Sequence, residues 1–120
     1  MHGADTLLAA ADDQVIAFQR DKTDWKETGR FSGPPGDAFG ARIEIGCDAG
    51  RLWIADTERH RVLCLDAATH ELLGTFGSRG RPGSRLHTLD RPTTITPRGT
   101  RCVVFDSNNH RLVKLELVAR

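Results

Sequence analysis

Short apolar runs separated by turn residues recur along the chain, and no useful length of it shows the 3.6-residue periodicity of a helix. In the central part, residues 42–46 alternate polar and apolar, and residues 52–55 and 62–65 are apolar at consecutive positions. Consecutive apolar residues between turns are typical of strands covered on both faces. Residues 71–76 are more polar and include Gly74, as expected of a strand at a sheet edge. The pattern predicts a four-stranded antiparallel sheet.

This central pattern is part of a repeat. Residues 51–66 (RLWIADTERHRVLCLD) match residues 101–116 (RCVVFDSNNHRLVKLE) in strict register, with equivalent residues 50 positions apart. The equivalent pairs include Asp56 with Asp106 and His60 with His110. A weaker copy lies upstream at residues 7–18, with two residues missing from its turn. A fixed period of this size indicates a repeat architecture.

Four strands per repeat, with a Gly- and Pro-rich loop leading to the next unit, describe a blade of a β-propeller. The first and last copies supply only three strands each, which we expect near residues 6–10, 14–18, 25–31, 93–96, 102–105 and 111–116. We therefore predict an all-β fold with one complete four-stranded antiparallel blade flanked by two incomplete ones. The chain would form a single domain over residues 1–120, divided into a blade fragment at 4–31, a complete blade at 42–76 and a blade fragment at 92–117.

Two features of the chain resemble the NHL repeat family. The turn at residues 106–111 (DSNNHR) is similar to the Asp-Ser, Asn-His-Arg turn of an NHL blade. Residues 55–61 (ADTERHR) resemble the same turn almost as well. Residues 76–80 followed by Arg91-Pro92 resemble the connection between NHL blades. The resemblance implies a propeller ring, which needs about six blades to close. The chain would then be about half of a six-bladed ring.

An incomplete ring leaves apolar sheet faces uncovered at both ends. Exposing several hundred Å² in this way is unfavourable by roughly 10 kcal/mol at about 25 cal/mol per Å². We therefore expect a binding or assembly module that is completed from outside. The candidates are a homo-oligomer, namely a dimer that closes a six-bladed ring, a separate partner segment, or the remainder of a longer propeller.

An Asp and a His separated by three residues recur in both copies, as Asp56 with His60 and as Asp106 with His110. Such pairs are candidate ligands for calcium or zinc, or a base with its orienting carboxylate. An active site is used once, whereas this pair recurs at the same place, so we interpret it as structural. We expect the Asp to accept backbone N–H groups, and Arg61 and Arg111 to pair with Asp groups on adjacent blades.

We accordingly predict no cofactor and no catalytic residue. The alternative is a part of a metal-dependent propeller lyase or hydrolase, because some similar propellers gather metal ligands from several blades around a central channel. Here such a site would need ligands from a second copy or from further sequence.

Arginines are concentrated in one stretch of the chain, at positions 79, 81, 85, 91, 98 and 101. The overall charge is only +1, so no strong field favours nucleic acid. If these arginines share one face, an anionic partner such as RNA is a second alternative. The loop at 79–90 is also longer than the preceding connection, and it contains His87, which lies outside the repeat register. The candidate binding residues for a protein or RNA ligand are Arg79, Arg81, Arg85, His87 and Arg91.

The remaining signals concern compartment and cysteine chemistry. Cys47, Cys64 and Cys102 form no CxxC motif, and we expect free thiols, with Cys64 and Cys102 buried in apolar runs. The chain has no secretory-type start and no apolar run near the roughly 20 residues of a membrane span. These features predict no membrane association, and they fit either a cytoplasmic protein or a segment of an exported one.

Overall fold

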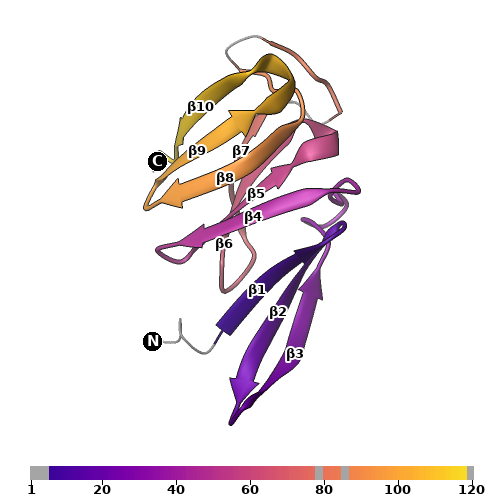
Figure 1. Ribbon diagram of the computed structural model, residues 1–120, viewed down its shortest axis with the longest axis vertical. Helices are drawn as coiled ribbons and strands as arrows, with labels where there is room; N and C mark the ends of the chain where they lie inside the picture. The colour runs from indigo at the N-terminus through magenta and orange to yellow at the C-terminus, as the bar shows by residue number, and fades with distance from the viewer. Residues whose placement is uncertain (1–5, 78–79, 85–86, 119–120) are drawn as a thin grey trace.

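The computed structural model describes residues 6–77, 80–84 and 87–118. Within this part of the chain, all regular structure apart from short 3-10 turns consists of antiparallel strands in three sheets (Figure 1). The first sheet has the order β1-β2-β3, with strands Thr6–Ala11, Gln14–Asp21 and Asp24–Phe31. The middle sheet has the order β4-β5-β6-β7, with strands Ile43–Asp48, Arg51–Asp56, Arg61–Asp66 and Leu72–Gly77. The third sheet has the order β10-β9-β8, where β8 is Pro92–Arg98, β9 is Arg101–Asp106 and β10 is Arg111–Glu116.

The all-β prediction is confirmed, and a four-stranded sheet is flanked by two three-stranded ones as expected. The first sheet lacks a counterpart of β4, and the third sheet lacks a counterpart of β7 within the described residues. The sheets follow one another along the long axis of the molecule, with the first at the bottom and the third at the top of Figure 1. β4 contacts both β1 and β8. This arrangement is consistent with incomplete propeller blades placed side by side.

The repeat in the sequence is also a repeat in the backbone. A 3-10 turn follows the Asp in both copies, as η2 (Thr57–Arg59) and η3 (Ser107–Asn109). Each turn ends at a histidine in the left-handed region, His60 with φ 58° and His110 with φ 51°. These matching turns reverse the chain between β5 and β6 and between β9 and β10.

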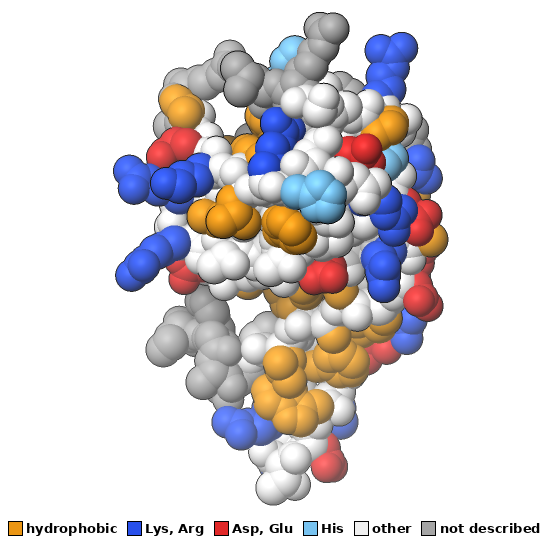
Figure 2. Space-filling model, turned by 45° about the horizontal axis from the view of Figure 1, so that its top comes forward, with side chains coloured by type: hydrophobic (Ala, Val, Ile, Leu, Met, Phe, Trp, Pro, Cys, Tyr) orange, Lys and Arg blue, Asp and Glu red, His pale blue; other side chains and the backbone are white. Residues whose placement is uncertain are grey.

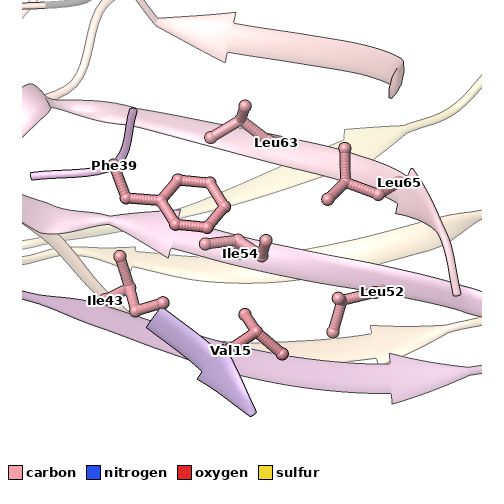
Figure 3. Close-up of a cluster of buried hydrophobic side chains, with 7 residues drawn as sticks. All are labelled: Val15, Phe39, Ile43, Leu52, Ile54, Leu63 and Leu65. Carbon is pink, nitrogen blue, oxygen red and sulfur yellow. The ribbon is translucent and has the colours of Figure 1, made fainter. Parts of the chain in front are cut away.

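The middle sheet is covered on both faces because β5 and β6 are apolar at consecutive positions. One face, which we call the rear face, carries Leu52, Ile54, Leu63 and Leu65. These side chains meet Val15 of the first sheet, together with Phe39 and Ile43 (Figure 3). The opposite face, the forward face, carries Trp53, Val62 and Cys64, which pack against Leu89, Cys102 and Val104 of the third sheet and its connecting loop.

The middle and third sheets approach most closely at β4 and β8. A Cβ atom placed on Gly46 would lie 2.7 Å from Cδ of Pro97 and 2.9 Å from Cγ2 of Ile95. Any larger residue at this position therefore requires the two strands to move apart. Gly46 sets the spacing between these sheets.

Candidate functional site

The predicted Asp of the middle sheet holds the loop that precedes its own sheet. The Asp56 side chain is fully buried; its Oδ1 accepts the backbone N–H of Gly40 at 2.9 Å and its Oδ2 accepts Arg61 Nε at 2.9 Å. Arg61 also donates through Nη1 to Asp37 at 2.9 Å and through Nη2 to the carbonyl of Ala38. Burial alone lowers the pKa of the Arg61 guanidinium, but its hydrogen bonds to Asp37 and Asp56 outweigh this effect and raise the pKa. The Asp–Arg pair thus fixes the loop against the β5–β6 turn.

The same set of contacts recurs in the third sheet. Asp106 is fully buried, and its Oδ1 accepts the backbone N–H of Asp90 at 2.7 Å. Its Oδ2 accepts Arg111 Nε and Asn109 Nδ2, both at 2.8 Å. Arg111 in turn donates through Nη2 to the carbonyl of Thr88 at 2.7 Å. Gly40 and Asp90 occupy equivalent places, since each lies sixteen residues before its Asp.

These contacts correct one expectation. Arg61 and Arg111 were predicted to pair with Asp groups on adjacent blades, but each pairs with the Asp of its own sheet. The reason is the strand register, because Asp56 and Arg61 are direct partners across β5 and β6, as Asp106 and Arg111 are across β9 and β10. Each Asp–Arg pair is therefore formed within one sheet and does not depend on a neighbouring sheet.

Contact with the next sheet is made instead by the residues of the turn. The Thr57 hydroxyl donates to the carbonyl of Pro92 at 2.8 Å, and Nδ1 of His60 accepts the backbone N–H of Arg91 at 3.1 Å. His60 Nδ1 also lies 3.6 Å from Oδ1 of Asp90. The equivalent His110 is exposed at the end of the third sheet. The turn of the middle sheet thus joins its neighbour, and the turn of the third sheet is positioned to do the same.

The two Asp–His pairs do not converge on a metal-type site in the described residues. The Asp56 carboxylate is directed to Gly40 and Arg61, whereas the His60 ring is directed to the backbone of Arg91. No group of three or more His, Cys, Asp or Glu side chains in the described part of the chain is arranged to hold a metal ion.

The described basic residues between positions 81 and 101 lie at both ends of β8 and β9. Arg81 and His87 are exposed in the loop before the third sheet, and Nη1 of Arg91 lies 3.8 Å from Oε2 of Glu58. Arg98 and Arg101 lie at the opposite end of β8 and β9, where Nε of Arg101 donates to Glu116 at 2.9 Å. Two further candidates, Arg79 and Arg85, lie outside the described residues.

The forward face of the third sheet is exposed where the same face of the middle sheet is buried. It is formed by Val103, Phe105, Leu112 and Lys114, which alternate with side chains directed at the middle sheet. Phe105 is 36% exposed and Leu112 69% exposed. Their equivalents in the middle sheet, Ala55 and Val62, are 0% and 1% exposed. The composition of this face is suited to burial, but nothing in the described chain covers it.

The rear face of the first sheet is exposed in part, although Ile16 on this face is buried. Leu8 and Val15 point toward the middle sheet, so Leu7, Phe18 and Trp25 lie on the opposite side. Leu7 is 50% exposed and Trp25 40% exposed, with the Arg20 guanidinium 5.7 Å from the centre of the Trp25 ring. Figure 2 shows hydrophobic side chains at the surface in the lower part of the molecule, where Figure 1 places the first sheet.

A cleft of about 450 Å³ lies beside the third sheet, between β7 and β10. Within the described residues β10 pairs only with β9, whereas the equivalent β6 pairs with both β5 and β7. Apolar side chains line the cleft, among them Trp53, Phe76, Leu115 and Leu117. The cleft therefore adjoins the position that a fourth strand would take in the third sheet.

The cysteines are free, and Cys64 and Cys102 are buried as predicted, while Cys47 is exposed. Burial raises the pKa of both the Cys64 and the Cys102 thiol to about 11, because a thiolate is poorly solvated between the sheets. In the described residues no helix is long and apolar enough to cross a membrane.

No protein-family model matches the chain, and no curated protein matches it. The sequence pattern indicated that sheet faces would be uncovered, but it did not single out Leu112, Phe105, Leu7 and Trp25. The alternation of side chains along each paired strand is the signal that identifies these residues.

Proposed function

We propose that the protein is an assembly module of the NHL propeller type, which associates through the rear face of its first sheet and the forward face of its third sheet. The observation that supports this most strongly is the contrast between repeat-equivalent positions. Val62 is buried by the next sheet, and Leu112 at the same place in the repeat is 69% exposed. The chain itself therefore shows what kind of surface covers such a face, namely another sheet of the same repeat.

The energy available at these faces is substantial. Full burial of a Leu or Phe side chain contributes about 1.5–3 kcal/mol relative to its exposure. The two faces together hold four large exposed side chains, Leu7, Trp25, Phe105 and Leu112. Because these side chains are already partly buried, covering the rest of them contributes about 3–6 kcal/mol in all. That is a sizeable share of the stability of a small domain, about 5–15 kcal/mol.

The two alternative functions have less support. A metal-dependent reaction needs free carboxylates and imidazoles, but Asp56 and Asp106 are occupied by backbone N–H groups and arginines of their own repeat. An anionic ligand needs convergent cations, whereas Arg91 and Arg98 lie at opposite ends of β8. Association through the apolar faces needs neither free carboxylates and imidazoles nor convergent cations.

The proposal is tested by sedimentation velocity of the unmodified chain beside two variants. Leu112→Asp places a charge on the forward face of the third sheet, and Leu72→Asp is the matched control, since Leu72 is 42% exposed on β7, outside both faces. We expect the unmodified chain and Leu72→Asp to associate and Leu112→Asp to remain monomeric. If the unmodified chain sediments as Leu112→Asp does at every concentration, the proposed function is wrong.

A further inference from the structure

Both contacts between sheets within the chain have the same orientation. The forward face of the first sheet, with Val15, meets the rear face of the middle sheet, with Leu52 and Ile54. The forward face of the middle sheet, with Trp53, then meets the rear face of the third sheet, with Cys102. Leu52 and Cys102 are equivalent in the repeat, so both contacts join a forward face to a rear face. In neither contact does a face meet one of its own kind.

The two faces that stay exposed are one of each kind. The third sheet exposes its forward face, around Leu112 and Phe105, and the first sheet exposes its rear face, around Leu7 and Trp25. Leu7 is the counterpart of Leu52, which is fully buried against the first sheet's forward face. The two ends of one chain therefore supply the two unlike halves of the contact that occurs twice inside it.

We infer that the partner is a second copy of this chain, bound head to tail, with the rear face of its first sheet on the forward face of the third sheet. This inference rests on the proposed function and specifies its partner and geometry. A head-to-tail contact uses different surfaces on the two copies, and its repetition closes a ring when the rotation permits. The sheet stacking of the chain then continues across the boundary between copies.

A symmetric contact between two third sheets fits the side chains less well. It would bring the Lys114 side chains of two copies to one apolar interface, and like charges at an interface are unfavourable. It would also join two forward faces, an arrangement that neither contact within the chain shows. Head-to-tail binding places only one Lys114 at each contact, against the first sheet, where Glu27 lies on the same face as Phe18 and is paired with Arg30.

Complementation between two variants tests this geometry. Leu112→Asp damages the forward face of the third sheet, and Leu7→Asp damages the rear face of the first sheet, at residues 69% and 50% exposed, so that the fold is retained. Every head-to-tail contact in either pure variant contains one damaged face. We expect each variant alone to associate more weakly by about 30-fold or more. In an equimolar mixture, the intact face of one variant meets the intact face of the other, and a one-to-one heterodimer forms.

The outcomes separate the inference from the function on which it rests. Sedimentation of the mixture as a heterodimer, with Leu72→Asp mixtures as the control, supports the head-to-tail contact. If the unmodified chain associates but the mixture stays monomeric, or if Leu7→Asp alone associates normally, the inference is wrong and the proposed function stands. If Leu112→Asp alone associates normally, both are wrong. Circular dichroism verifies the fold of each variant, and Trp25→Ser replaces Leu7→Asp if the latter unfolds, because Trp25 is on the same face. An unmodified chain that never associates overturns both.

Discussion

Removal of the charge on Asp56 should destabilise the fold far more than the same change at a surface carboxylate. In Asp56→Asn, the amide oxygen can still accept the N–H of Gly40, but the ion pair with Arg61 is lost. Arg61 keeps its ion pair with Asp37, but its side chain is only 4% exposed, so water cannot replace Asp56. Breaking a buried pair on one side costs about 3–5 kcal/mol, and the remaining Asp37 pair places the expected cost at the lower end, about 3 kcal/mol. That is a large share of the roughly 5–15 kcal/mol expected for a small domain.

The equivalent substitution in the third sheet provides an internal comparison. Asp106 is as buried as Asp56, but its partner Arg111 is 29% exposed and can regain water. Asp106→Asn should therefore cost less, about 1–3 kcal/mol. Asp21→Asn is the surface control, because Asp21 pairs with Lys26 at an exposed site and such pairs contribute at most about 1 kcal/mol.

Urea denaturation, followed by the fluorescence of Trp53 and Trp25, measures all three changes in the free energy of unfolding. The measurements belong in the Leu112→Asp background, because association would otherwise add to the apparent stability. The expected order of destabilisation is Asp56→Asn, then Asp106→Asn, then Asp21→Asn. A cost below about 1 kcal/mol for Asp56→Asn, or a larger cost for Asp106→Asn, would refute the argument from burial.

Two further predictions concern the packing between the sheets. Gly46→Ala should destabilise the fold by about 1–3 kcal/mol, because the added methyl group would overlap Pro97. The control Gly29→Ala, whose Cβ would have nothing within 4 Å, should stay within about 1 kcal/mol of the unmodified chain in the same urea assay. Equal effects of the two substitutions would contradict the close approach of β4 and β8. In native protein at neutral pH, alkylation followed by mass spectrometry should label Cys47 before Cys64 and Cys102, whose thiols have a pKa of about 11 and form thiolate only as the pH rises toward that value. Labelling of Cys64 as fast as Cys47 would show that the middle and third sheets separate readily.

Much of the fold is already specified by local sequence. Consecutive apolar residues at 52–55 and 62–65 require cover on both faces, and the structure places them in the most buried strands. The 50-residue register predicts two identical turns, and η2 and η3 share both their 3-10 form and their left-handed histidine. In these elements the local pattern and the tertiary packing agree, which is why the strands could be predicted from the sequence.

The interactions of individual side chains were harder to predict. The partners of Arg61 depend on which carboxylate lies opposite in the sheet, and that register becomes certain only when the strands are paired. The arginine cluster shows the same limit in another form. Arg91 and Arg98 are seven positions apart in the sequence, but an extended strand of that length separates them by about 20 Å. Proximity along the chain therefore does not by itself bring Arg91 and Arg98 to one place.

The mass of the unmodified chain in solution tests the central claim most directly. One chain has a mass of 13.2 kDa, and a closed head-to-tail pair has twice that, 26.4 kDa. Sedimentation equilibrium should give the larger mass in concentrated solution and a shift toward the smaller one on dilution. A mass of 13.2 kDa at every concentration would contradict the claim that these exposed sheet faces are interfaces between copies.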